Sequence, residues 1–322
     1  MTKRKQNKQR GLSRYVLPLL LGGAGAAMLY RQYQQDRADA DRTRRLGSRL
    51  IETRLGTVEY AERGTGIPVL LFHGLGTGYQ HLDLLPHFYD TSVYRLMSFS
   101  RPGYLRTLQN VAPSAGEQAD LAAAVLDANG CYDAHIIAIS SGGLPALSFA
   151  QRHRDRCLTL TMLSAVTPLY STPDLADTAE QFISWATQQD FLFWLALNLG
   201  GRSAVLRSNG ASPSDLPDDK AFAIIDTVRD TVFPPSVWSS GLQNDIRILK
   251  AFNPDSITDI TAPSLFIHGT DDLAASYENA RETASNLPTS RFLTIDGGTH
   301  FVMATHHREI GLAIGDMLTE YA

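Results

Sequence analysis

Short, unbroken apolar runs recur along the chain and constrain its fold more than any other feature. A strand that is buried on both faces of a parallel sheet has this pattern. Amphipathic stretches with helical spacing separate the runs. The alternation predicts an α/β fold with a mostly parallel, twisted sheet and helices on both faces. The apolar runs are residues 68–74, 94–100, 135–140, 158–163, 264–269 and 291–295, and the helical stretches are 116–130, 143–153, 276–287 and 308–322.

Two regions depart from this alternation. Residues 49–64 alternate in polarity and break at Gly56 and Gly64, which predicts two antiparallel strands at the start of the sheet. No strand-like run lies between Pro168 and Pro263, but residues 179–200 and 218–230 have helical patterns, and all three tryptophans fall in this interval. Because the interval is too long for a plain loop, we expect a helical cap inserted at about 169–262.

The N-terminal region has its own charge pattern. Residues 1–45 contain eleven Lys and Arg and three acidic residues, whereas residues 46–322 contain 18 basic and 30 acidic residues. The acidic body argues against nucleic acid as a partner. We therefore divide the chain into a basic N-terminal region, 1–45, which ends in a linker or helical stalk, and a main domain, 46–322.

An apolar segment at about 15–30 follows the first basic residues. It predicts a single N-terminal membrane anchor, with the main domain on the extracytoplasmic side. The small residues at 24–26 leave open a cleaved signal peptide, which would give a secreted or periplasmic protein, and an amphipathic or disordered tail is the third alternative.

Two cysteines, Cys131 and Cys157, precede neighbouring predicted strands and would lie at the same end of the sheet. A disulfide bridge between them and a pair of buried free thiols both remain open.

The stretch HIIAISSGG, residues 135–143, runs from a predicted strand into a predicted helix. A sharp strand-to-helix turn needs small residues two positions before and two positions after the exposed residue. Ala138 and Gly142 satisfy this for Ser140, whereas Ser141 would place Ile139 in the crowded position. The pattern favours Ser140 as the exposed serine, and the backbone N–H of Ser141 can then face a developing oxyanion.

From Arg49 onward the chain resembles the α/β-hydrolase superfamily, whose nucleophile motif is G-x-S-x-G. Here the motif reads A-I-S-S-G, with Ala138 in place of the first glycine. The family order of nucleophile, acid and base implies Asp272 as the acid, with Asp271 as the competing choice, and His300 as the base. His306 and His307, at the start of the last helix, are expected to be solvated.

The resemblance also extends to the stretch FHGLGTG, residues 72–78. It resembles the family motif whose residue after the glycine donates the second oxyanion N–H, and this implies Leu75. We expect His73 to hold this loop and Arg101, in SFSRPGY, to have a structural role.

The resemblance implies a serine hydrolase that forms an acyl-enzyme on a small-molecule acyl substrate, with no metal or organic cofactor. We favour carboxylic esters of small apolar substrates, because apolar aromatic residues dominate the expected cap. Proline-iminopeptidase-like, C–C hydrolase and cofactor-free haloperoxidase activities are the enzymatic alternatives. The non-enzymatic alternative is a membrane-tethered binding protein on a hydrolase fold. The oligomeric state does not follow from the sequence.

Overall fold

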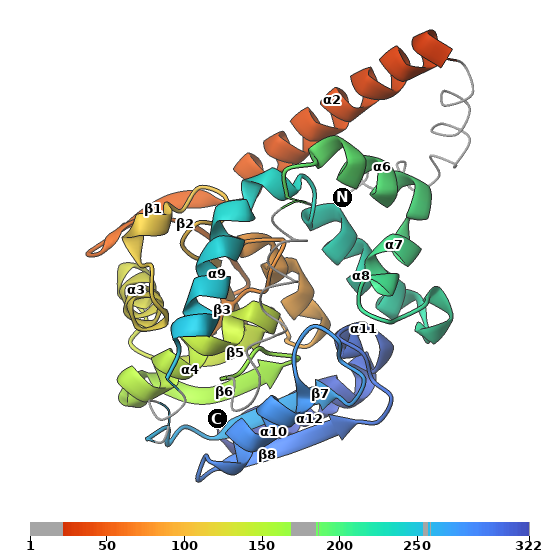
Figure 1. Ribbon diagram of the computed structural model, residues 1–322. Helices are drawn as coiled ribbons and strands as arrows, with labels where there is room; N and C mark the ends of the chain where they lie inside the picture. The colour runs from red at the N-terminus through yellow and green to blue at the C-terminus, as the bar shows by residue number, and fades with distance from the viewer. Residues whose placement is uncertain (1–21, 169–184, 186, 254–256, 258, 322) are drawn as a thin grey trace.

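A computed structural model describes residues 22–168, 185, 187–253, 257 and 259–321. The described residues form an eight-stranded sheet in the order β1-β2-β4-β3-β5-β6-β7-β8 (Figure 1). β1 and β2 pair antiparallel, as do β2 and β4, and the remaining neighbours are parallel. The strands are β1 Arg49–Thr53, β2 Gly56–Arg63, β3 Ile67–Phe72, β4 Tyr94–Phe99, β5 Ala134–Ile139, β6 Cys157–Leu163, β7 Ser264–Gly269 and β8 Ser290–Ile295.

The central strands are covered on both faces, which explains their unbroken apolar sequences. All six residues of β5 are buried. In β3, Leu70 and Phe72 pack into one buried cluster and Val69 and Leu71 into the other, because successive side chains point to opposite faces. The predicted mostly parallel sheet with helices on both faces is confirmed.

Helices form the two outer layers. α3 and α4 contribute to the same cluster as Leu70, and α8, α12 and the 3₁₀ segment Tyr79–His87 contribute to the opposite one. The side chain of Ser114 caps the first turn of α3 and Glu117 completes a capping box, so this helix begins where the sequence places it. The helices are α2 Gly22–Gly47, α3 Ala115–Ala128, α4 Gly143–Arg152, α6 Asp190–Gly200, α7 Arg202–Arg207, α8 Asp219–Thr231, α9 Ser239–Ala251, α10 Tyr277–Ser285, α11 Val302–Thr305 and α12 His307–Glu320.

The described residues between β6 and β7 are mainly helical, as the sequence predicts. They contain α6, α7, α8 and α9, of which α6 and α7 lie on the side of the molecule away from α3 and α4 (Figure 1). Part of the helical stretch expected at 179–200 lies outside the described residues, and α6 forms its C-terminal half, Asp190–Gly200. We refer to the described residues between β6 and β7 as the inserted segment.

The apolar segment expected at 15–30 is described in part. Residues 15–21 lie outside the described residues, and 22–30 form the start of α2. Among the described residues, no helix is both long enough and apolar enough to cross a membrane. The expected linker or stalk is the rest of α2, a 26-residue helix that ends at Gly47.

The first half of α2 packs against the inserted segment. Leu29 and Tyr33, four residues apart and thus on one face of the helix, are buried against Trp194 and Phe233. The Tyr33 ring meets the Trp194 ring edge-on at a centroid distance of 5.8 Å. The indole N–H of Trp194 donates to Asp36 at 3.0 Å, so apolar and polar contacts both hold α2 to α6.

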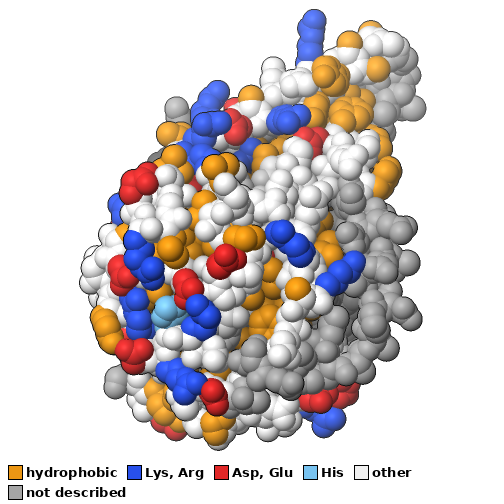
Figure 2. All heavy atoms as spheres, turned by 60° about the vertical axis from the view of Figure 1, so that its left-hand side comes forward, with side chains coloured by type: hydrophobic (Ala, Val, Ile, Leu, Met, Phe, Trp, Pro, Cys, Tyr) orange, Lys and Arg blue, Asp and Glu red, His pale blue; other side chains and the backbone are white. Residues whose placement is uncertain are grey.

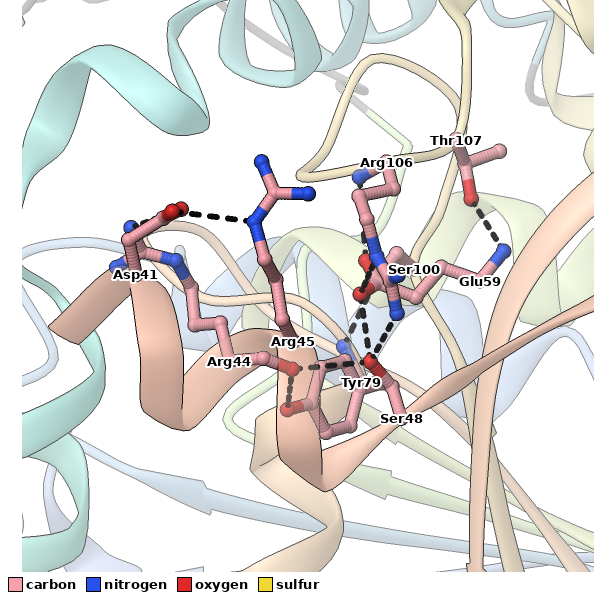
Figure 3. A network of polar contacts seen from close by, with 9 residues as sticks. All are labelled: Asp41, Arg44, Arg45, Ser48, Glu59, Tyr79, Ser100, Arg106 and Thr107. Atoms are coloured by element: carbon pink, nitrogen blue, oxygen red, sulfur yellow. Dashed lines mark hydrogen bonds and ion pairs between the residues drawn. The ribbon is translucent and has the colours of Figure 1, made fainter. Parts of the chain in front are cut away.

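The other end of α2 is fastened to the sheet domain by a polar network (Figure 3). The Tyr79 hydroxyl donates to the Arg44 carbonyl at 2.7 Å. Ser48 and Arg106 donate to the buried Glu59 carboxylate, which also accepts a hydrogen bond from Ser100. Because α2 is held at Leu29–Asp36 and again at its C-terminal end, it is part of the folded domain and not a free linker.

Both cysteines are free thiols, so the structure has no Cys131–Cys157 bridge. The two side chains are buried at the start of β6 and before β5, at one end of the sheet as expected. Burial raises the pKa of each thiol, and for Cys157 it is the only cause.

Replacing Tyr33 by alanine tests the packing of α2. We expect Tyr33→Ala to lower the free energy of unfolding by about 3 kcal/mol, because the change leaves a cavity among Trp194 and Phe233. Tyr30→Ala is the matched control, because Tyr30 lies on the same helix with 55% of its surface exposed. Urea denaturation followed by circular dichroism measures both. Equal midpoints for the two variants would contradict a structural role for Tyr33.

Candidate active site

The turn between β5 and α4 places Ser140 in a strained backbone conformation. Its φ angle is +52°, in the left-handed region that non-glycine residues seldom adopt. The turn is tight because two glycines allow close backbone approach. A Cβ at Gly142 would lie 2.1 Å from the Phe72 carbonyl oxygen, and one at Gly143 would lie 2.0 Å from that of Val166. The geometry agrees with the strand-to-helix turn that the sequence predicts at Ser140.

Three of the predicted site residues come together around this turn. The Nε2 atom of His300 lies 3.0 Å from the Ser140 hydroxyl oxygen. The Nδ1 atom of His300 lies 2.8 Å and 3.0 Å from the two carboxylate oxygens of Asp272. Ser140 follows β5, Asp272 follows β7 and His300 follows β8, so the carboxyl ends of three parallel strands deliver the three groups.

The carboxylate of Asp272 is held by several donors. It accepts the backbone N–H groups of Ala274 and Ala275 and lies 3.2 Å from Nε2 of His268. Burial alone would raise the pKa of Asp272, but the hydrogen bonds from His268 and His300 outweigh it and hold the pKa well below its usual value. The carboxylate is therefore ionised at neutral pH.

Asp271, the competing choice for the acid, is exposed and accepts a hydrogen bond from the Thr270 hydroxyl instead. The structure brings Asp272, and not Asp271, to His300.

The loop after β3 lies directly against Ser140. A Cβ at Gly74 would lie 2.9 Å from the Ser140 Cβ atom, so only glycine fits there without displacement. Leu75, the predicted oxyanion donor, is the next residue. Buried His73 holds this loop: its Nδ1 lies 2.8 Å from the Gly74 carbonyl and its Nε2 accepts the Arg101 backbone N–H at 2.9 Å. Burial and the Arg101 charge lower the pKa of His73, which keeps it neutral.

His81, in the 3₁₀ segment after this loop, supports it from the other side. Its Nδ1 accepts the Gly74 backbone N–H at 3.2 Å, which requires a neutral ring. Burial, followed by the nearby charges of Arg101 and His300, lowers the pKa of His81 to about 3. Both histidines therefore act as fixed hydrogen-bonding groups that shape the loop.

Arg101 is fully buried and connects three parts of the site. Its guanidinium forms two 2.6 Å contacts with Asp245 of α9 and donates to the Ser141 hydroxyl at 2.9 Å. Its Nε donates to the His73 carbonyl at 3.0 Å. The Tyr104 hydroxyl also donates to Asp245, at 2.6 Å. The expected structural role of Arg101 thus includes a tie between the inserted segment and both predicted oxyanion loops.

The expectation that His307 is solvated is wrong. Its side chain is buried, and Nε2 lies 2.9 Å from the carboxylate of Asp218, the residue that caps the start of α8. The capping aspartate accounts for the burial, because it offers a partner inside the interface between α8 and α12. His306 is partly exposed and lies 2.8 Å from the Thr305 hydroxyl.

Sequence reasoning missed four residues that support the site: Tyr104, at the end of the SFSRPGY stretch, and His81, Asp245 and His268, which lie outside the recognised motifs. His81 and His268 are lone histidines in apolar surroundings, and Asp245 lies on a helix whose packing the sequence did not reveal. None of these residues stands at a sequence spacing that would identify it as part of the site. No group of three or more His, Cys, Asp or Glu placed to hold a metal ion occurs within the described part of the chain.

The sheet, the strained serine turn and the histidine beside it are the features of a hydrolase. A family model described as "alpha/beta hydrolase fold" matches residues 67–307, and the chain belongs to this family. The chain is therefore a member of the α/β-hydrolase class, as the sequence resemblance implies.

Individual relatives agree with this assignment. An uncharacterised hydrolase of Bacillus subtilis, YcgS, is 35% identical over 122 residues, which are 37% of this chain and 41% of that protein. The match thus spans less than half of the curated relative. A thermophilic esterase from Thermogutta terrifontis superposes with a TM-score of 0.64 at 19% identity, over 85% of this chain and 98% of that chain. A bacterial membrane phospholipase A superposes with a TM-score of 0.65 at 19% identity, over 96% of this chain and 99% of that chain.

Neutralising Asp245 tests the buried ion pair. We expect Asp245→Asn to lower the free energy of unfolding by about 3 kcal/mol, because it leaves the Arg101 charge buried and without its partner. Glu278→Gln is the control, because the Glu278–Arg281 pair is exposed on α10 and should leave the denaturation midpoint unchanged. A midpoint for Asp245→Asn equal to that of the wild type would show that the pair contributes little to the fold.

Proposed function

We propose that the protein hydrolyses carboxylic esters through Ser140, His300 and Asp272. The observation that carries the proposal is the unbroken chain of contacts from the Ser140 hydroxyl through both nitrogens of His300 to Asp272. A serine hydroxyl is a weak nucleophile at neutral pH and needs a base that takes its proton. The base in turn needs a carboxylate that fixes its tautomer, and ionised Asp272 supplies it.

In the acylation step, the Ser140 oxygen attacks the ester carbonyl carbon while Nε2 of His300 takes the hydroxyl proton. Nδ1–H of His300 donates to Asp272, which stabilises the imidazolium that forms. The tetrahedral intermediate collapses when the C–O bond to the alcohol breaks. The departing alkoxide takes the proton from Nε2, which leaves an acyl-enzyme and neutral His300.

In the deacylation step, water adds to the acyl carbonyl as His300 takes one of its protons. The second tetrahedral intermediate then releases Ser140, and the proton returns from Nε2 to the serine oxygen. The products are one carboxylic acid and one alcohol, and the enzyme recovers its starting state. Both steps are proton transfers and additions to a carbonyl, which the three side chains carry out without a redox partner.

The oxyanion of each intermediate is assigned to the backbone N–H groups of Leu75 and Ser141. Support comes from the close approach of Gly74 to Ser140 and from the place of Ser141 at the start of the α4 turn, where the helix dipole favours negative charge. The Ser141 hydroxyl is held by Arg101, so this side chain serves the loop and does not act as a nucleophile.

Small apolar esters are the substrates that we favour. The inserted segment is rich in aromatic and aliphatic side chains, and the esterase and the phospholipase to which the chain is similar both act, by their names, on ester bonds. Aminopeptidase, C–C hydrolase and haloperoxidase activities use related sites and are the competing activities.

We also propose that the N-terminal segment, about 15–30, attaches the protein to a membrane with the hydrolase domain on the extracytoplasmic side. Support comes from the basic residues before an apolar sequence. The match to the membrane phospholipase covers 96% of this chain, compared with 85% for the esterase. A secreted or periplasmic protein after signal cleavage is the competing placement.

A fluorophosphonate probe tests whether Ser140 is activated. We expect the full-length wild type and Ser141→Ala to be labelled and Ser140→Ala to remain unlabelled, because only the Ser140 hydroxyl contacts His300. Labelling is read by gel fluorescence and the site by peptide mass spectrometry. A folded wild type that is not labelled, or that is labelled at another residue, would overturn the assignment and favour a non-catalytic binding protein.

Adjacent aspartates provide a matched test of the acid. We expect Asp272→Asn to lower kcat for a p-nitrophenyl ester by about 10⁴-fold, because an amide cannot hold His300 in the tautomer that accepts the serine proton. Asp271→Asn removes the same charge one residue away, on an exposed side chain, and should leave kcat unchanged. A large loss in Asp271→Asn with none in Asp272→Asn would reverse the assignment.

A further inference from the structure

One exposed surface of the molecule lacks the charged side chains that water-facing helices normally have. α6, with the sequence DFLFWLALNLG, contains one charged residue, Asp190. That residue is buried and directed inward, where it accepts hydrogen bonds from the backbone and hydroxyl of Ser236. Leu192 is nevertheless 49% exposed, and Phe193, Leu195 and Leu199 are only partly buried. A helix that is apolar all round and lies at a surface is not a usual soluble element.

The start of α2 continues this surface. Residues 22–30 carry no charged side chain, and Met28 and Tyr30 are 60% and 55% exposed. The Tyr30 ring lies 6.4 Å from the ring of Phe191 in α6, so the two helices form one patch. Figure 1 shows the two helices together at the top of the molecule, and Figure 2 shows hydrophobic side chains gathered there. We call Met28, Tyr30 and the exposed face of α6 the apolar end.

We propose that the apolar end lies in the interface of a lipid bilayer, so that the inserted segment and α2 dock on the membrane together. The proposal rests on the membrane attachment proposed above and adds the surface and the substrate class. A bilayer is favoured over a second protein copy by the sequence that leads into α2. Residues 15–21 are apolar, and residues 1–14 contain six Lys and Arg and no acid, which suits anionic headgroups.

Charge and aromatic placement support the same orientation. Outside the N-terminal region the protein is acidic, so most of its surface is repelled by anionic lipid and the apolar end is the exception. Tyr30 is followed at once by the exposed Arg31, and Tyr and Arg at such a boundary are typical of headgroup depth. From Gln32 onward α2 becomes polar, which places the interface near residue 30.

Rigid contacts connect the apolar end to the active site. Tyr33 and Trp194 pack on Phe233, and Arg44 of α2 donates to the Phe233 carbonyl at 3.1 Å. The next residues toward the site are Val232 and Trp238, which lie within 4 Å of a Cβ built at Gly76, one residue after Leu75. Packed side chains thus connect the apolar end to the loop that carries Leu75.

This arrangement selects the class of substrate. An inserted segment that is seated in the interface meets esters that have already partitioned into the bilayer, such as esters of long-chain fatty acids. A substrate of this class is dissolved in the lipid that the apolar end contacts, whereas a polar ester reaches the protein from water. We therefore extend the small apolar esters favoured above to larger apolar esters that dissolve in the membrane, and we expect esters that stay in water to be poorer substrates.

Site-directed fluorescence on the full chain tests the docking. Leu192→Cys and Met28→Cys are labelled with an environment-sensitive dye, and Leu312→Cys is the control, because Leu312 is an exposed leucine on α12 with 71% of its surface accessible. The two native thiols are buried and have raised pKa values, so they react slowly. Vesicles of phosphatidylethanolamine and phosphatidylglycerol carry a nitroxide quencher in their acyl chains.

We expect the nitroxide to quench most of the emission at positions 28 and 192 and none at 312. Quenching at 28 with none at 192 would show an N-terminal anchor without docking of α6, and would overturn the proposal. Quenching at none of the three positions would overturn it together with the membrane attachment. Equal quenching at 192 and 312 would show unspecific adsorption, which also contradicts it.

Hydrolysis rates on two substrates provide a second, independent test of the docking. Leu192→Glu should lower the hydrolysis of a long-chain ester dissolved in the vesicles roughly ten-fold, because one large apolar side chain no longer enters the interface. Hydrolysis of p-nitrophenyl acetate in solution should be unchanged, and Leu312→Glu should change neither rate. An equal fractional loss of both activities would show that Leu192 acts on the fold or the active site and not on docking. That result would contradict the proposed role of this surface. A wild type that is inactive on both substrates would refute the proposed esterase activity. The quenching result would still decide whether the apolar end docks on the membrane.

Discussion

The tight turn at Ser140 is the constraint on which the rest of the site depends. A serine in the left-handed backbone conformation at the end of a buried strand costs conformational energy, and the surrounding backbone must hold it there. Phe72, at the end of β3, and Val166, in the segment after β6, do so at distances that only Gly142 and Gly143 permit. Because β3 and β6 flank β5 in the parallel sheet, strand order and nucleophile geometry are set by the same contacts.

A second layer of fixed groups surrounds this turn. His73 and His81 are buried and neutral, and the Nδ1 atom of each holds Gly74 in the loop after β3: that of His73 contacts the carbonyl oxygen and that of His81 accepts the N–H. Arg101 is buried and charged, and Asp245 neutralises it from the inserted segment. The inserted segment is therefore bound to the catalytic domain by a charge that cannot be left unpaired, which limits how far α9 can move without loss of the oxyanion loops.

The sequence predicted most of the sheet because burial on both faces leaves a strong local pattern in strands such as 135–140 and 264–269. It favoured Ser140 on steric grounds, since the need for small flanking residues is itself local. Asp272 and Asp271 could not be separated on those grounds, because adjacent loop residues differ only in the direction of their side chains. Asp272 is distinguished by contacts with His268, Ala275 and His300, which the fold brings together from separate elements.

The parts that the sequence did not reveal depend on pairing across long distances. His307 was expected to be solvated because its own helix gives no reason for burial, and the reason lies at Asp218, on α8. The polar half of α2 has the composition of a linker, yet Asp36 bonds Trp194 and Arg44 bonds the Phe233 carbonyl. A few such contacts keep this polar segment helical and packed on the domain. A helix that is held by tertiary contacts gains stability that its sequence alone does not supply. The same contacts mean that α2 cannot tilt without moving the inserted segment, so whatever the start of α2 is attached to also sets the position of the segment above the active site.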